Sequence, residues 1–219
     1  MPVSALRARK KKRRVSPADT HTTIDMAPGR TRFGKTGLLI VVVAVVVTLD
    51  QLTKFWIVRS IGFHDQVQVI GDFFRLTYTH NPGAAFGINI GEYSPIFFLV
   101  LSLAALVVLG LIYRSTPVTD RVRLLAVSLV SGGAIGNIID RVLYNGERLG
   151  HVGRFHVGVV DFLDFEFIDI VFNIGMFNMD MRRWPVFNVA DMAVSTGAVL
   201  LLFSFYLEGR RERSAEDTG

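Results

Sequence analysis

Two aspartates lie among apolar residues, where a charged side chain is costly. Asp161 stands in the run Val-Val-Asp-Phe and Asp191 in the run Phe-Asn-Val-Ala-Asp, and neither has a basic residue within four positions. If the two carboxyl groups approach each other, they cannot both ionise easily, so the pair shares one proton. One carboxylate can then activate water while the protonated partner polarises a peptide carbonyl, as in aspartic proteases. The same segment carries other carboxylates that could be the partner instead: Asp164, Glu166, Asp169 and Asp180.

Further polar residues fall near predicted helix ends at the same depth: Asp50, Lys54, Asn137, Asp140, Arg141 and Asn188. Asp50 and Lys54 are four positions apart, so they share a helix face and can form an ion pair. Asp140 is followed directly by Arg141, which suggests a second pair. These groups are either ordinary helix-end charges and caps or pairs that hold the helices around the two aspartates, and the sequence leaves both interpretations open.

Several other kinds of site lack their residues. The chain has no cysteine, which excludes disulfides, thiolate zinc sites and cysteine nucleophiles. It has no His-Glu-x-x-His and no Gly-x-Ser-x-Gly motif, so zincin and serine-hydrolase sites are not supported. His151 and His156 have only weak ligand spacing, and we expect both to be solvated. We therefore expect no metal and no cofactor.

The elements that must position these residues are membrane helices. The mean hydropathy is +0.40, and residues 38–49 and 95–113 contain no charge. The second run, at about 1.5 Å per residue, nearly crosses a hydrocarbon core of about 30 Å. The length is consistent with one compact domain. Four spanning helices fit the sequence, at 34–58, 95–113, 121–141 and 186–207.

The third of these helices is the least hydrophobic. It contains Gly132, Gly133 and Gly136. Small residues let helices approach one another closely, so we expect this helix to be buried among the others.

Basic residues orient the chain in the membrane. If the N-terminus is inside, the inner segments carry Lys and Arg at more than three times the density of the outer segments 59–94 and 141–185. The positive-inside rule then places both termini in the cytoplasm.

The N-terminal segment is strongly basic, with eight residues at 7–14 that include seven Lys or Arg. Such a run could bind nucleic acid, but beside a spanning helix we favour a disordered cytoplasmic extension that touches anionic lipid. The expected organisation is an extension at 1–33, a membrane domain at 34–207 and a cytoplasmic tail at 208–219.

The segment between the first two helices has β-type composition at 67–70 and 73–80. Phe74, Leu76 and Tyr78 alternate with polar residues, which favours a strand with one buried face. The Asn-Pro-Gly that begins at Asn81 predicts a turn. The predicted fold is an all-α membrane protein with four transmembrane helices, a small extracytoplasmic β-sheet and a second outer segment of loop or helix.

Five blocks of sequence, in this order, resemble lipoprotein signal peptidase, the type II signal peptidase of bacteria: DQLTK at 50–54, NPGAAF at 81–86, GGAIGNIIDR at 132–141, VVDF at 159–162 and FNVAD at 187–191. The resemblance covers about residues 47–197. It implies four helices, a small extracytoplasmic β-cradle and a periplasmic helix, with Asp161 and Asp191 as the catalytic residues. It implies supporting or substrate-binding roles for Asp50, Lys54, Asn81, Gly83, Asn137, Asp140, Arg141, Asn188 and Ala190.

The resemblance implies an intramembrane aspartyl endopeptidase of the bacterial cytoplasmic (inner) membrane, with its active site at the outer face. It would remove signal peptides from diacylglyceryl-modified prolipoproteins by cutting before the lipidated cysteine. The glycines of the third helix would let the substrate's own helix approach. The implied partners are prolipoproteins and membrane lipid, without nucleic acid, and nothing demands more than a monomer. A small membrane transporter or scaffold that uses the same carboxylates is the alternative.

Two outer stretches are longer than the family pattern. They lie at 142–158, before Asp161, and at 166–183, after it. We expect the first to form a flap or rim that shapes access to the two aspartates.

Overall fold

The computed structural model describes residues 34–81, 93–143, 158–166, 170–174, 177–181 and 184–216. The basic extension, Gly83 and most of the expected flap lie outside these residues. The helices are α1 (Lys35–Ser60), α2 (Ser94–Ser115), α3 (Arg121–Leu143) and α4 (Val189–Glu216). The strands are β1 (Gln66–Ile70), β2 (Phe74–Asn81), β3 (Val159–Phe165), β4 (Ile170–Ile174) and β5 (Phe177–Met181).

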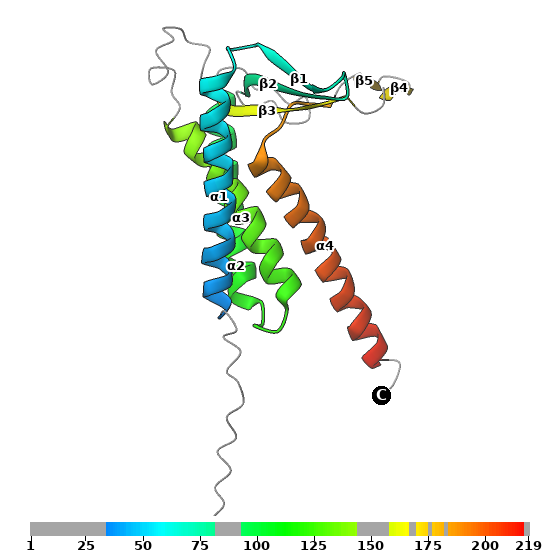
Figure 1. Ribbon diagram of the computed structural model, residues 1–219. Helices are drawn as coiled ribbons and strands as arrows, with labels where there is room; N and C mark the ends of the chain where they lie inside the picture. Colours follow the sequence, from blue (N-terminus) through cyan, green and yellow to red (C-terminus); the bar gives the residue numbers. More distant parts are fainter. Residues whose placement is uncertain are drawn as a thin grey trace, which may run out of the picture. The chain divides into compact units, whose positions relative to one another are not determined.

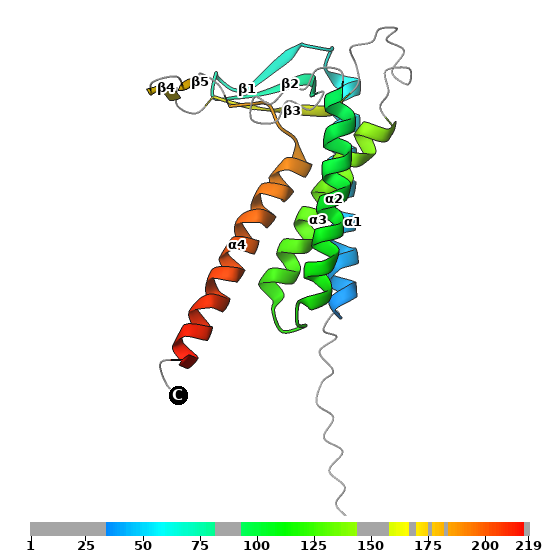
Figure 2. The same cartoon turned by 180° about the vertical axis from the view of Figure 1, so that it is seen from behind.

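All four helices are long and apolar enough to cross a membrane, with candidate spans of 22 to 26 residues. This confirms the four helices expected from hydropathy. Strands β1, β2 and β3 lie at one end of the helices, as Figures 1 and 2 show from opposite sides. We call this the sheet end, and the opposite end of the helices the far end.

Helix α3 packs closely against two neighbours through its glycines. A Cβ added at Gly132 would lie 2.9 Å from Cβ of Val46 on α1, and one at Gly133 would overlap the carbonyl oxygen of Ala190 on α4. As expected, α3 is the buried helix, with 56% of its span buried against 6% for α2. The expectation that these glycines admit a substrate helix is wrong, because the chain's own helices occupy the glycine faces.

The three-stranded sheet is antiparallel with the order β1-β2-β3. Strands β1 and β2 confirm the two predicted strands. Strand β3 was not predicted, and it places Asp161 opposite Thr79 of β2. The first predicted catalytic residue therefore lies in the sheet rather than in a loop.

A hydrophobic cluster attaches this sheet to the helices. Ile57 and Ile61, from the end of α1, pack against Tyr78 of β2 and against Val160 and Phe162 of β3. Burying an apolar side chain of this size contributes about 1.5–3 kcal/mol. The cluster holds β3, and with it Asp161, at a fixed place above α1.

The second outer segment differs from the expected loop or helix. Its described residues form β3 and a separate antiparallel hairpin, β4–β5, in which Ile170 pairs with Met181 and Ile174 with Phe177. No helix follows α3 among the described residues before α4 begins. Strands form here because this segment is rich in Phe, Val and Ile, which favour strands.

Candidate active site

The described members of the predicted site come together at the sheet end. They are Asp50 and Lys54 on α1, Asn81 at the end of β2, Asn137, Asp140 and Arg141 on α3, Asp161 on β3, Asn188 just before α4, and Ala190 and Asp191 in its first turn. Asp50, Lys54, Asp140 and Asn188 have no exposed surface. Buried polar groups of this kind need partners, and each of the four has several.

Asn188 and Asp191 form the N-terminal cap of α4. Oδ1 of Asn188 accepts a hydrogen bond from the Asp191 amide at 3.0 Å, and Oδ2 of Asp191 accepts one from the Asn188 amide at 3.2 Å. This reciprocal pattern is a capping box, formed here by Asn and Asp three positions apart. It fixes the Asp191 carboxylate at the positive end of the helix dipole, which favours negative charge.

Two asparagine amides link the two aspartates. Nδ2 of Asn188 donates to Oδ1 of Asp161 at 2.6 Å, and Nδ2 of Asn137 donates to Oδ1 of Asp191 at 2.9 Å. The two amides also meet, because Nδ2 of Asn188 lies 3.3 Å from Oδ1 of Asn137. Both aspartates are thereby held in one hydrogen-bonded network with donors that carry no charge.

Asp161 is almost fully buried, with 2% of its surface exposed. Burial first, and then the negative charge of Asp191, raise the pKa of Asp161 to about 8, although hydrogen bonds from Asn81 and Asn188 act in the opposite direction. A carboxyl group with this pKa keeps its proton at neutral pH. The raised pKa of Asp161 has the direction expected if the pair shares one proton.

A second buried cluster surrounds Lys54. Its Nζ lies 2.8 Å from Oδ2 of Asp50, 2.7 Å from Oδ2 of Asp140 and 3.2 Å from Oδ1 of Asn137. All three ammonium protons thus have an acceptor. The predicted Asp50–Lys54 pair is confirmed, but Lys54 also takes Asp140, which the sequence had suggested for Arg141.

The two carboxylates of this cluster also hold the backbone of the catalytic elements. Oδ1 of Asp50 accepts a hydrogen bond from the Ala190 amide at 2.9 Å, and Oδ2 of Asp140 accepts one from the Val160 amide at 3.1 Å. Each amide belongs to the residue directly before a catalytic candidate. The cluster therefore sets the positions of Asp161 and Asp191 without contacting the reacting groups.

Gln51 is a member of the network that the sequence analysis missed. Its Nε2 lies 2.9 Å from Oδ1 of Asp140, 3.1 Å from Oδ2 of Asp50 and 3.2 Å from the carbonyl oxygen of Gly136. The available signal was its place in the DQLTK block, next to Asp50 and three residues before Lys54. Positions three and four apart on a helix share a face, so Gln51 points to the same side as the lysine.

Arg141 does not pair with Asp140, because adjacent helix positions do not face each other. Its Nη1 lies 3.3 Å from the carbonyl oxygen of Asn137, and its guanidinium lies 6.0 Å from the ring of Phe98 on α2. Its positive charge acts on Asp191 more strongly than on Asp161. Arg141 thus places a cation beside the pair from the α2 side.

No metal site accompanies these carboxylates in the described part of the chain, where no group of three His, Cys, Asp or Glu side chains could hold an ion.

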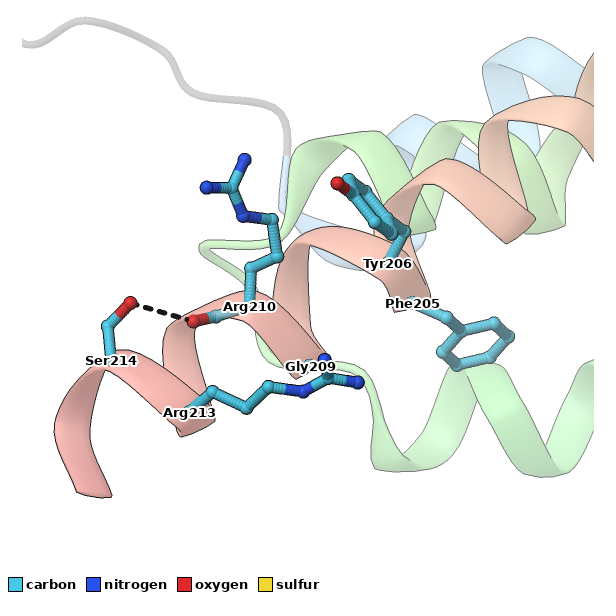
Figure 3. Close-up of a pocket in the computed structure, with 6 residues that line it drawn as sticks. All are labelled: Phe205, Tyr206, Gly209, Arg210, Arg213 and Ser214. Carbon is cyan, nitrogen blue, oxygen red and sulfur yellow. Dashed lines mark hydrogen bonds between the residues drawn. The ribbon is translucent and has the colours of Figure 1, made fainter. Parts of the chain in front are cut away.

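A hollow of about 590 Å³ lies along the far end of α4 (Figure 3), and Tyr206, Arg210 and Arg213 border it. It starts more than three helical turns beyond Asp191. It is therefore separate from the two aspartates.

Comparisons with known proteins identify the family. The family model for signal peptidase II matches residues 42–207. A lipoprotein signal peptidase from Syntrophotalea carbinolica is 39% identical over 81% of this chain and 96% of its own length, and one from Moorella thermoacetica is 37% identical over 74% and 89%. A solved bacterial membrane enzyme is similar with a TM-score of 0.59 and 30% identity, over 80% of this chain and 97% of its own.

The match covers most of α1 and α4, all of α2 and α3, the three-stranded sheet and every residue of the two buried clusters. The transporter and scaffold alternatives find no support in these comparisons. With relatives above 30% identity over most of its length, the chain belongs to the signal peptidase II family of proteases.

Proposed function

We propose that the chain is an aspartic endopeptidase whose catalytic pair is Asp161 and Asp191. Its family supplies the reaction, the removal of signal peptides from prolipoproteins. The observation that carries the assignment is that Asn188 joins the two carboxyl groups, one buried and one half-buried. Its side chain lies 2.6 Å from Asp161 and caps the helix of Asp191. Such a pair can hold one proton and bind one water molecule.

The environments of the two aspartates suggest how they divide the work. Asp191 accepts hydrogen bonds from two donors at a helix N-terminus, which stabilises its carboxylate. The raised pKa of Asp161 keeps its carboxyl protonated. Asp191 would take a proton from the attacking water, while Asp161 donates a hydrogen bond to the peptide carbonyl oxygen. The proton on Asp191 then passes to the leaving amine as the peptide bond breaks.

The family resemblance extends this proposal to the substrate and the membrane. The substrate is a diacylglyceryl-modified prolipoprotein, cut before its lipidated cysteine. Both termini lie in the cytoplasm of a bacterium, and the sheet end faces the outer side of the inner membrane. The density of basic residues supports this orientation. A site at a membrane surface also has access to the water that hydrolysis consumes.

Purified full-length protein in detergent tests the proposal with two forms of one prolipoprotein, with and without the diacylglyceryl group. We expect cleavage of the modified form only, and mass spectrometry should find the lipidated cysteine at the new N-terminus. Asp72→Asn is a suitable control, because that carboxylate is 78% exposed in the β1–β2 turn. Equal cleavage of both forms, or cleavage at another bond, would contradict the proposed substrate.

A further inference from the structure

The far end of α4 has a feature that the proposed reaction does not use. Six residues of α4 border the hollow of Figure 3: Phe205, Tyr206, Gly209, Arg210, Arg213 and Ser214. They lie three and four positions apart, so they form one face of the helix over three turns. Two aromatic rings occupy the first turn of this face and two guanidinium groups the later turns.

The order of these groups matches the depth of a membrane. About 20 helical residues cross the hydrocarbon core, so a helix that begins at Val189 reaches its far boundary near Glu208. Phe205 and Tyr206, exposed by 43% and 60%, lie just inside this boundary. Arg210 and Arg213 lie just beyond it, at the level of lipid headgroups.

Two nearby acidic side chains, Glu208 and Asp120, form ion pairs with Arg123 and not with these arginines. Arg123 of α3 binds Glu208 at 2.8 Å and Asp120 at 3.3 Å. Neither Arg210 nor Arg213 has an ion-pair partner among the described residues. Glu212 is two positions from one and adjacent to the other, and helical neighbours at these spacings do not face each other. The face therefore carries two positive charges without an ion-pair partner among the described side chains.

Gly209 leaves space between the aromatic and cationic turns. A Cβ added there would have no atom within 4 Å. The Ser214 hydroxyl donates to the Arg210 carbonyl oxygen at 3.0 Å, within its own helix. A ligand in the hollow would thus meet two guanidinium groups, which bind phosphate oxygens well, and the ring of Tyr206, which suits an acyl chain. The ring of Phe205 also borders the hollow, and the guanidinium of Arg123 lies 4.7 Å from its centre.

We propose that this face of α4 binds an anionic phospholipid, with its phosphate held by Arg210 and Arg213 and its glycerol and upper acyl chain against Tyr206 and Phe205. An anionic lipid is favoured over a zwitterionic one because the described side chains that border the hollow are cationic, aromatic or neutral, and none is acidic. In the proposed orientation this lipid belongs to the cytoplasmic leaflet. The binding itself depends only on the membrane span of α4 and not on the peptidase assignment.

Native mass spectrometry of the full chain, released from nanodiscs of equal phosphatidylglycerol and phosphatidylcholine, tests the proposal. We expect retained phosphatidylglycerol on the wild type and about tenfold less on Arg210→Gln/Arg213→Gln. Arg59→Gln is the control, since that arginine is exposed at the sheet end and stacks on Phe55 at 3.9 Å. Unchanged retention in the double variant would overturn the proposal.

Gly209→Leu distinguishes a built site from charge alone. The leucine fills the hollow but keeps both arginines, so we expect it to reduce retention of phosphatidylglycerol as well. Full retention would show that the lipid does not use the hollow, and the proposal would fail.

A competition measurement separates a lipid site from a phosphate site. Inorganic phosphate and glycerol phosphate should not displace the lipid, because they lack the acyl chain that contacts Tyr206 and Phe205. Complete displacement by either would overturn the lipid assignment. Peptide cleavage in detergent should be unchanged in all these variants, so failure here stays distinct from failure of the proposed function.

Discussion

Two pairs of buried carboxylates lie near each other at the sheet end, and they differ in what joins them. Asp50 and Asp140 share the ammonium group of Lys54, at 2.8 and 2.7 Å. Asp161 and Asp191 both accept hydrogen bonds from Asn188 instead, Asp161 from its side-chain Nδ2 and Asp191 from its backbone amide. An ammonium group neutralises a carboxylate, whereas an amide only donates a hydrogen bond. The first pair is therefore held by a shared cation, whereas the second is held by uncharged donors.

This difference assigns a separate task to each pair. The carboxylates of the lysine cluster accept hydrogen bonds from the backbone amides of Val160 and Ala190. These are the residues just before the two catalytic candidates. The cluster fixes the geometry of the two segments that carry Asp161 and Asp191. The asparagine-linked pair can gain or lose a proton within the range in which enzymes work. The costly buried ion cluster thus holds in place the pair that we propose as catalytic.

The largest expected effect comes from removing either carboxyl group of the reactive pair. Asp161→Asn and Asp191→Asn keep the shape of the side chain but cannot transfer the proton, so cleavage should fall by about a thousandfold. Single-turnover cleavage of a prolipoprotein in detergent measures it. Melting temperatures should stay close to that of the wild type, and Asp72→Asn should cleave normally. A variant that folds and still cleaves would move the catalytic role to another carboxylate.

Removal of the shared lysine should act on stability first. Lys54→Met leaves two buried carboxylates without their cation, which costs about 3–5 kcal/mol in comparable buried pairs. Thermal unfolding in detergent should show a clear drop in melting temperature, and Arg59→Met, an exposed cation at the same end, should not. Adding Asp140→Asn to Lys54→Met should restore part of the loss. An unchanged melting temperature would mean that the cluster does not hold the fold.

Substitutions of Asn188 separate its two roles. Asn188→Ala loses both the cap of α4 and the bond to Asp161, so it should lower stability by about 0.5–2 kcal/mol and also reduce cleavage. Asn188→Ser keeps a good cap but lacks the Nδ2 donor, so its stability should be nearer to the wild type while cleavage falls equally. Parallel melting and cleavage measurements test this. Equal cleavage by Asn188→Ser and wild type would show that the hydrogen bond from Nδ2 of Asn188 to Asp161 is not needed for cleavage.

The smallest expected effect is a pH dependence. The pKa of Asp161 is raised to about 8 by burial and by Asp191. The stabilisation contributed by the protonated carboxyl is therefore complete below the ordinary carboxyl pKa of 3.8, and it is lost progressively as the pH rises from there to about 8. The melting temperature of the wild type should decline over this range more than that of Asp161→Asn. Identical pH profiles would contradict a retained proton on Asp161.

Hydropathy predicted the four helices because each needs a continuous apolar run long enough to cross the hydrocarbon core, and such a run is visible locally in the sequence. The end of α4 was missed, since its helix continues to Glu216 in charged residues beyond 207 that a hydropathy pattern does not include. Strand β3 was missed for another reason. Its residues pair with β2, about eighty to ninety residues earlier, and no local signal shows such a partner.

The sequence predicted which residues lie together better than it predicted which side chains contact each other. Asp161 and Asp191 stood out because no cation was near them in sequence. The pairing of Asp50 with Lys54 follows from their helical spacing. The second partner of Lys54 comes from a different helix, so neighbourhood in sequence favoured Arg141 for Asp140 wrongly. Only the packing of α3 against α1, through Gly132 and Gly136, brings Asp140 to the lysine.

Infrared spectroscopy of the carboxyl groups tests the contrast between the two pairs most directly. At pH 7 the wild type should show the band of one buried protonated carboxyl group, which disappears as the pH is raised past about 8. The band should be absent from Asp161→Asn and present in Asp72→Asn. If the wild type shows no such band at pH 7, or if Asp161→Asn keeps it, then Asp161 does not hold the proton and the distinction drawn between the two pairs is wrong.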